Sequence, residues 1–266
     1  MAYELILRLS MFLGLFALFA ALEALAPRRA RAQPRQRRWG TNLVLVVIDT
    51  LALRALALLL PALAIGAALD AGRNGWGLFN QLDWPWGVEL LLAVLILDLA
   101  IWAQHLVTHK VPLLWRFHRV HHADRDMDVT TGLRFHPVEI LASMGVKIGA
   151  VYLLGPSALA VLLFEVLLNG TSLFNHANFR LPDRFDRLIR LVLVTPDMHR
   201  VHHSVQRDEH DSNFGFALSV WDRIFGTYRA QPAGGHDAMQ VGLEWQDDKP
   251  ARLGWALRLP FQRSRP

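Results

Sequence analysis

Cysteine does not occur in this 266-residue chain. Its absence excludes disulfide bonds, thiolate-bound zinc, cysteine-held iron–sulfur clusters and a cysteine nucleophile. Any metal ion must therefore be bound through nitrogen or oxygen atoms.

Charge is also scarce. Charged residues make up 19% of the chain and hydrophobic residues 53%, whereas about 25% charge is usual in soluble domains. Much of the positive charge lies in one run, residues 28–38 (RRARAQPRQRR). Basic runs also occur in nucleic-acid-binding proteins, but a run between two apolar segments is more typical of a cytoplasmic loop. We therefore expect a membrane protein without a nucleic-acid partner.

The apolar residues gather in runs that approach the roughly 20 residues needed for a membrane span. We expect spans at residues 5–25, 43–69 and 88–106, with a kink at Pro61, then a helical hairpin at 137–154 and 158–168 whose second arm extends to 174. Each arm of the hairpin is short, so a tilted or partly inserted hairpin stays open. A signal peptide is the alternative for the first run, but positive charge should then precede it.

Two charged residues, Asp49 and Arg54, lie inside the second apolar segment. Charges within a span are candidates for function. A local or interhelical pairing, or a shallow position, is the simpler expectation for both.

The basic run also predicts the orientation of the chain. If it is cytoplasmic, the second span leads out and the third returns at His105, while the hairpin enters and comes back before His176. The sequence thus predicts an all-α integral membrane bundle with a histidine-rich metal-binding cap on the cytoplasmic face. We expect the inner or plasma membrane of a bacterium, and one domain over residues 1–266 with its histidine-rich core at about 88–230.

Two later segments have apolar residues that suit a membrane surface. Residues 183–194 show the spacing of an amphipathic helix, either in the interface or facing the protein core. The tail at 252–263 places Trp255, Leu257, Leu259 and Phe261 among arginines and is interpreted as a second surface anchor. Residues 110–117 are interpreted as a turn between a spanning helix and a surface helix.

Histidine is the most distinctive residue of this sequence. His105 and His109 form an HxxxH pair, and HRVHH occurs twice, with His118, His121 and His122 in the first copy and His199, His202 and His203 in the second. At helical spacing each cluster forms one stripe. Eight imidazoles exceed what one tetrahedral ion binds, so two metal ions are expected. The HExxH pattern of zinc proteases is absent, which disfavours a hydrolytic site and favours a redox metal.

The order HxxxH, HxxHH and HxxHH resembles the histidine boxes of the fatty acid hydroxylase / sterol desaturase superfamily of membrane di-iron oxygenases. The similarity extends over DLAIWAQHLVTH, PLLWRFHRVHHADRDMDVTTGLRFHPVE, FNHAN, TPDMHRVHH, SNFG and WDRIFGTY, which cover about residues 98–228. This combination is highly specific.

The resemblance implies that the eight box histidines ligate metal, together with His176 of FNHAN. It places His136 of RFHPVE beside the metal ligands, with direct ligation as the alternative. Asp98 is seven residues before His105 and is expected to accept a hydrogen bond from a ligand imidazole, or else to make a helix-packing contact. Asn175, Asn178 and Asn213 are candidates for similar supporting roles. We expect His210 and His236 at the surface.

The resemblance further implies two non-haem iron ions and O2 as co-substrate, acting on an unactivated C–H bond of a membrane lipid. Hydroxylation and desaturation are both compatible with these motifs. Electrons must come from an external donor of ferredoxin, cytochrome b5 or reductase type. The alternative class is a non-enzymatic membrane protein that binds or transports metal or haem, although a transporter should place its ligands near the membrane midplane.

Overall fold

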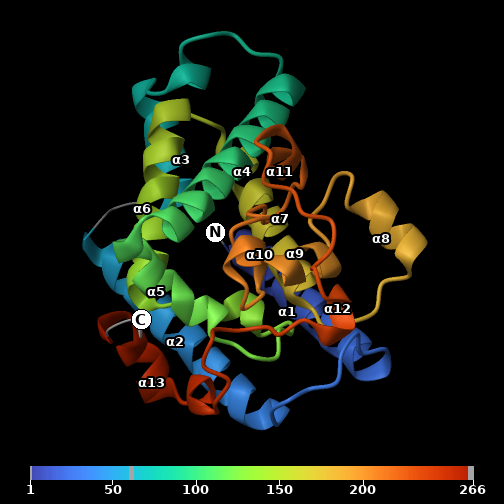
Figure 1. The fold of residues 1–266 in the computed structure, drawn as a ribbon. Coiled ribbons are helices and arrows are strands. Elements are labelled where there is room, and N and C mark those ends of the chain that lie inside the picture. The colour runs from blue at the N-terminus through green and yellow to red at the C-terminus, as the bar shows by residue number, and fades with distance from the viewer. Residues whose placement is uncertain (1, 60–62, 263–266) are drawn as a thin grey trace.

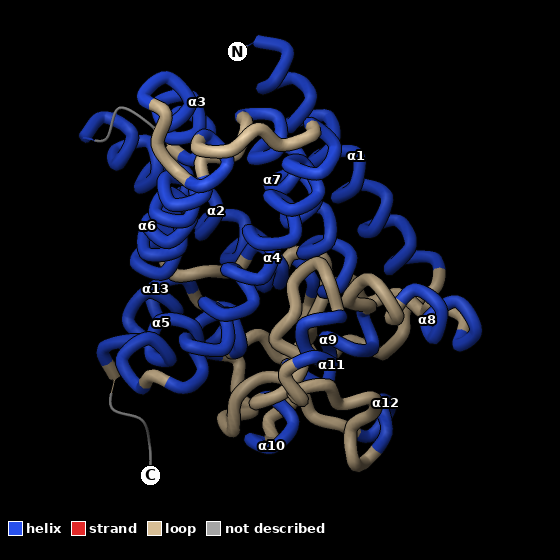
Figure 2. Tube along the Cα trace, turned by 90° about the horizontal axis from the view of Figure 1, so that it is seen from above, coloured by secondary structure: helices blue, strands red, loops and turns tan. Residues whose placement is uncertain are grey.

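The computed structural model describes residues 2–59 and 63–262. Within these residues every regular element is a helix, which confirms the all-α prediction (Figures 1 and 2). The α-helices are α1 (Ala2–Leu25), α2 (Arg35–Leu59), α3 (Ala64–Asn74), α4 (Trp86–Lys110), α5 (Pro112–His122), α6 (Pro137–Leu154), α7 (Ala158–His176), α8 (Asp183–Ile189), α9 (Pro196–His202), α10 (Arg207–His210), α11 (Val220–Ile224), α12 (Gly235–Ala238) and α13 (Leu253–Arg258). Short 3-10 turns are η1 (Leu78–Asn80), η2 (Thr131–Leu133), η3 (Lys249–Ala251) and η4 (Leu259–Phe261).

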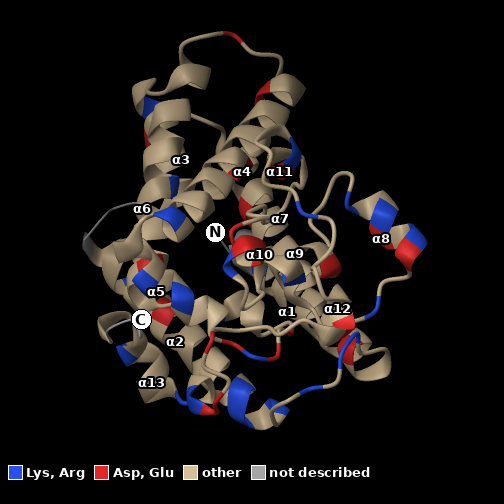
Figure 3. Cartoon of the chain, in the orientation of Figure 1, with Lys and Arg blue, Asp and Glu red and all other residues tan. Residues whose placement is uncertain are grey.

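Five helices of the described chain are long and apolar enough to cross a membrane. They are Ile6–Leu25, Arg35–Leu58, Trp86–Lys110, Pro137–Leu154 and Ala158–His176. The long helices carry few charged residues, which gather instead in the short helices and loops (Figure 3). The turn between the two arms of the hairpin lies where the sequence predicts. Gly155 ends α6 in a left-handed conformation (φ 65°), and Ser157 caps the start of α7.

The single span expected at 43–69 is wrong in both of its bounds. Helix α2 begins at Arg35, and α3 is a separate helix that runs to Asn74 and ends at left-handed Gly75. Pro61, the expected kink, lies outside the described residues. Hydropathy does not show the earlier start because the first turn of α2 is basic.

The turn expected at residues 110–117 is also wrong, because it consists of little more than Val111. Helix α4 continues through Lys110, and Pro112 starts α5 at once. Proline is well suited to this first helical position, where no helical N–H bond is lost. The short turn brings the histidines of α5 directly beside those of α4.

The long helices pack around an apolar core that adjoins the histidines. Leu97, Ile101, Met144 and Phe164 are buried there, with small alanines of α3 against them. Helix α1 packs on α7, α2 packs on α6, and α4 contacts both α6 and α7. This arrangement holds the histidine-bearing end of α4 next to the C-terminal end of α7.

Helix α8 covers only the first part of the amphipathic segment expected at 183–194. Phe185 is 44% exposed, and Leu188 and Val192 are at least 60% exposed. The alternative of a core-facing helix is therefore wrong. The exposed apolar face remains compatible with the expected position in a membrane interface.

The C-terminal tail does not form the expected surface anchor. Leu259 is fully buried and packs with Leu45 and Val120, and only Phe261 of the four apolar residues is strongly exposed. The Arg119 side chain donates hydrogen bonds to the carbonyl oxygens of Leu259 and Gln262. The tail is thus part of the protein core beside α5.

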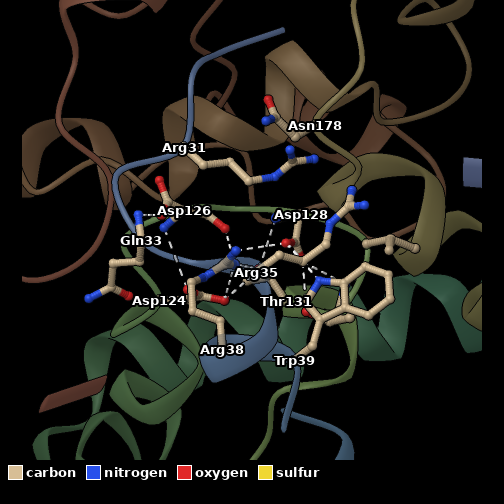
Figure 4. Close-up of polar contacts among 12 residues, drawn as sticks. Arg31, Gln33, Arg35, Arg38, Trp39, Asp124, Asp126, Asp128, Thr131 and Asn178 are labelled. Carbon is tan, nitrogen blue, oxygen red and sulfur yellow. Dashed lines mark hydrogen bonds and ion pairs between the residues drawn. The ribbon is translucent and has the colours of Figure 1, made fainter. Parts of the chain in front are cut away.

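The basic run at 28–38 is tied down by carboxylates rather than lying open. Arg28 pairs with Asp197 and Asp237, and Arg35 pairs with Glu23 at the end of α1. Arg38 is only 1% exposed and points among Asp124, Asp126 and Asp128 (Figure 4). Its contacts anchor the start of α2 to the loop that follows α5.

Candidate metal centre

All nine histidines proposed as metal ligands meet in one buried region. They come from the C-terminal ends of α4 and α7, from α5, and from α9 with its capping residue. Each is at most 7% exposed: His105, His109, His118, His121, His122, His176, His199, His202 and His203. Thr195 caps α9 by accepting a hydrogen bond from the backbone N–H of Met198, and Pro196 follows in the first helical position.

The nine side chains form two separate groups. The five-histidine group contains His105, His109, His118, His122 and His202, and the four-histidine group contains His121, His176, His199 and His203. In each group one ring nitrogen per histidine lies within 4.8 Å of the others. Each group therefore offers enough nitrogen atoms for one metal ion.

Both HRVHH boxes contribute to both groups. In the first box, His118 and His122 belong to the five-histidine group and His121 belongs to the four-histidine group. In the second box, His202 belongs to the five-histidine group, and His199 and His203 belong to the four-histidine group. Residues i, i+3 and i+4 share one helical stripe, in which i+3 and i+4 lie on opposite sides of i. Two boxes that face each other can therefore each supply two adjacent metal positions.

The distances between ring nitrogens fit a shared ion. His105 Nε2 lies 3.0 Å from His118 Nε2, and His176 Nε2 lies 3.1 Å from the Nε2 atoms of both His121 and His199. Two nitrogens at about 2.1 Å from one ion, the usual bond length to zinc, would be about 3.0 Å apart if they subtended a right angle.

Backbone carbonyls orient four of these imidazoles. The Nδ1 atoms contact the carbonyl oxygens of Phe214 (from His105), Arg134 (from His121), Ser172 (from His176) and Ser212 (from His202), at 2.6–3.2 Å. An Nδ1–H that donates to a carbonyl leaves Nε2 unprotonated and able to bind metal. The nitrogens that face the middle of the groups are thus prepared as ligands.

Several of the buried ring nitrogens have no hydrogen-bond partner among the described residues. Both ring nitrogens of His109, His122 and His203 are in this state, as is Nε2 of His202. Burial, reinforced by neighbouring imidazoles, keeps the pKa of His121, His122, His199 and His203 well below the ordinary value. Neutral imidazoles with unused lone pairs are suited to metal ions, so the residues fit two metal positions.

Glycine is required where the loop before α6 meets α7. A side chain at Gly132 would place its Cβ 2.6 Å from the Ser172 carbonyl oxygen and 3.1 Å from His176 Nδ1. Gly132 therefore allows the close approach that encloses the four-histidine group.

Glu139 also contacts the centre, a role that was not predicted from the sequence. Its Oε1 lies 2.5 Å from His118 Nδ1, and the carboxyl group is 8% exposed. The contact fixes the ring of His118 with Nε2 toward the five-histidine group. The signal was present in RFHPVE, where the glutamate lies one helical turn after the cap of α6.

Glu139→Ala is expected to weaken metal binding by about 10–100-fold, the usual effect of losing such a partner. Titration of the purified protein with metal, followed by the bound metal per chain, measures this. Glu139→Gln should retain most of the affinity because its amide oxygen still accepts the hydrogen bond. Equal affinity of Glu139→Ala and the parent chain would contradict the role.

Asp98 and His136 do not support the ligands as expected. Asp98 accepts hydrogen bonds from Trp221 Nε1 at 2.8 Å and from the backbone N–H of Leu218 at 3.2 Å, which makes it a packing contact. His136 caps α6, where its Nδ1 accepts the N–H of Val138. Neither belongs to a histidine group.

The three asparagines also bond elsewhere. Asn175 donates to the Phe216 carbonyl, and Asn178 bonds to the backbone of Arg29. Asn213 has a positive φ of 52° and donates to the Met198 carbonyl. It thereby shapes the loop whose carbonyls at positions 212 and 214 orient two imidazoles, so its support is indirect.

The expectation that His210 and His236 lie at the surface is wrong. His236 is buried, with Nε2 3.7 Å from Asp197. His210 is partly buried, stacks on Trp115 with ring centroids 5.2 Å apart, and forms a further possible metal group with His109 and Asp211.

A cavity of about 140 Å³ reaches the centre from the side of the long helices. It is lined by His105 and His118, and by Glu139, Lys147 and Asn169. A molecule in this inner cavity would lie directly against the five-histidine group.

Comparison with known proteins agrees with this arrangement. Residues 90–227, about half of the chain, match the sequence model of the family described as fatty acid hydroxylase. Similar proteins include an ornithine lipid hydroxylase of Rhizobium tropici (29% identity; 56% of this chain, 44% of that protein), human alkylglycerol monooxygenase (32%; 59% and 34%) and human cholesterol 25-hydroxylase (31%; 53% and 51%). The chain thus spans about a third to a half of these relatives. No solved structure matches. On the match over its histidine-bearing half, the chain belongs to the fatty acid hydroxylase family.

Proposed function

We propose that this protein is an integral membrane lipid hydroxylase that holds two iron ions and uses O2. The observation that carries the proposal is the pair of buried imidazole groups beside a cavity among apolar helices. The three relatives are hydroxylases or monooxygenases that act on ornithine lipid, alkylglycerol and cholesterol. Desaturation, which shares the first attack on a C–H bond, is the alternative product.

The five-histidine and four-histidine groups would each hold one iron ion. Bound iron supplies the reduction of O2 and the oxidation of the C–H bond. The balanced reaction is RH + O2 + 2 e⁻ + 2 H⁺ → ROH + H2O. The two electrons come from a donor protein of ferredoxin, cytochrome b5 or reductase type.

The chain itself contributes orientation and the exclusion of water. The carbonyl and Glu139 contacts fix the imidazole rings, so little rearrangement is needed when metal binds. The inner cavity presents a lipid carbon to the five-histidine group, and the buried side chains around it exclude bulk water.

We further propose one domain over residues 1–266, in the inner or plasma membrane of a bacterium, with the metal centre on the cytoplasmic face. The basic run lies at the same end as the histidines, since Arg38 contacts Asp124, two residues after His122. Such an excess of arginine next to spans is typical of the cytoplasmic side. The ion pair of Arg28 with Asp237 joins the loop after α1 to the C-terminal third of the chain.

Expression in a host without the activity should yield a membrane lipid one oxygen heavier than its precursor. Growth under ¹⁸O2 should place the label in that lipid, as measured by mass spectrometry. His122→Ala, expressed to the same level, serves as the control without product. A product that lacks two hydrogens would indicate desaturation, and no lipid change at all would contradict the proposal.

A further inference from the structure

The inner cavity adjoins a larger one on the side of α1 and α2. The outer cavity has a volume of about 460 Å³ and shares Gly132, Phe135, Ile140 and Asn169 with the inner cavity. Because these four residues line both cavities, we interpret the two together as one route toward the histidines, which we call the lipid passage.

The outer part of the lipid passage lies between α1 and α2. Leu9 and Met11 of α1 line one side of it and are more than 40% exposed, and Val46 and Leu53 of α2 line the other. Both helices are of membrane-spanning length and composition. A lipid tail can therefore enter from the bilayer and reach the histidines without passing through water.

Three acceptor oxygens of the lipid passage lack a donor among the described residues. They are Asp49 Oδ1 in the outer part, and Gln104 Oε1 and Glu139 Oε2 in the inner part. Asp49 is 7% exposed and forms no ion pair with the described residues, so the local or interhelical pairing expected from the sequence is not found. A buried acceptor without a donor is unfavourable, so a ligand that supplies one is favoured here.

The charges of the passage argue against an anionic ligand. Glu165 pairs with Arg8 at 2.7 Å and with Lys147 at 3.2 Å. Of the charged residues that line the passage, Asp49 and Glu139 are carboxylates and Arg8 and Lys147 are cations. Both cations are already paired with Glu165, so a fatty acid anion would meet carboxylates and no unpaired cation among the described residues.

We propose that the lipid passage binds an uncharged lipid whose hydroxyl or amide N–H donates a hydrogen bond to Asp49. This inference rests on the proposed function, because the same lipid presents a carbon further along its chain to the metal centre. Asp49 is then a specificity-determining residue. A lipid of equal length without a donor would leave Asp49 Oδ1 without a hydrogen-bond donor and should bind about tenfold more weakly.

The test uses the full chain in phosphatidylcholine nanodiscs and two photoreactive probes. One is a 16-carbon fatty alcohol with a mid-chain diazirine and a terminal alkyne, and the other is its methyl ether. The alcohol should label the chain about tenfold more than the ether, at peptides of α1, α2 and α7. Asp49→Val should reduce labelling by the alcohol to the level of the ether, whereas Asp49→Asn should retain the preference.

Thr50→Val is the matched control. Thr50 lines the same cavity, but its hydroxyl donates to the Val46 carbonyl of its own helix at 2.8 Å, so the preference should not change. Equal labelling by alcohol and ether in the parent chain would overturn the proposal even if Asp49→Val failed to fold. An equal loss of both probes in a folded Asp49→Val chain would also overturn it. Labelling needs no O2 or electrons, so these failures leave the hydroxylase proposal standing, and absent hydroxylation leaves the binding result standing.

Discussion

Replacing His202 or His203 with alanine is expected to reduce the bound metal from two ions to about one per chain in each variant. The two residues are neighbours in sequence, but His202 belongs to the five-histidine group and His203 to the four-histidine group. The remaining ion should therefore occupy a different position in each variant. Lipid hydroxylation should fall more than about a hundredfold in both, beyond the effect of losing an outer partner, because the proposed reaction needs both ions.

Metal analysis and product measurement on purified chains check this result. His118→Ala should behave like His202→Ala, because both residues belong to the five-histidine group. His236→Ala is the matched control, since this histidine is buried but lies outside both groups. It should keep two ions and full activity. Two ions and full turnover in His202→Ala would show that His202 is not a metal ligand.

The meeting of the histidines could be predicted because it depends on two regularities of sequence. Spacings of three and four residues place side chains on one helical face, and the alternation of spans returns His105 and His176 to the same end. The division into two groups depends on how α5 and α9 face each other. No local spacing contains that information.

The supporting contacts were poorly predicted because most are made by backbone carbonyls. The carbonyls of Ser212 and Phe214 orient two imidazoles, yet any residue type carries a carbonyl. Asp98 and His136 were predicted as supporting residues because their side chains can form hydrogen bonds. Asp98 instead bonds to Trp221 and Leu218, and His136 bonds to the backbone of Val138. Glu139, the carboxylate that is hydrogen-bonded to the His118 ring, lies three residues after His136 in the same motif.

The start of α2 was missed for a different reason. A hydropathy scale assigns arginine to solvent-exposed positions, but Arg38 is buried. It donates hydrogen bonds to the carboxylates of Asp124 and Asp128 and to the carbonyl oxygen of Asp126, all in the loop after α5. These partners lie more than 80 residues away in sequence. Residues 28–38 are therefore not only a basic loop, because residues 35–38 form the first turn of α2.

Arg38→Met is expected to lower the free energy of unfolding by about 3–5 kcal/mol, because it leaves buried carboxylates without a cation. Arg38 donates to both carboxylate oxygens of Asp124 and to Asp128 (Figure 4). Burial alone would raise the pKa of Asp124, but Arg38 and Arg134 lower it to about 2. The unfolding midpoint in detergent, with Arg37→Met as the exposed control, measures the change, and Arg37→Met should stay within about 0.5 kcal/mol of the parent.

The cause of this loss can be separated from a simple loss of packing. Without Arg38, burial should raise the pKa of Asp124 above the ordinary 3.8. A raised pKa in the folded state destabilises the ionised form, so the deficit should be larger at pH 8 and shrink toward pH 5. Adding Asp124→Asn to Arg38→Met should recover part of the stability, because it removes one uncompensated charge. A deficit that is independent of pH and unchanged in the double variant would instead assign the role of Arg38 to packing.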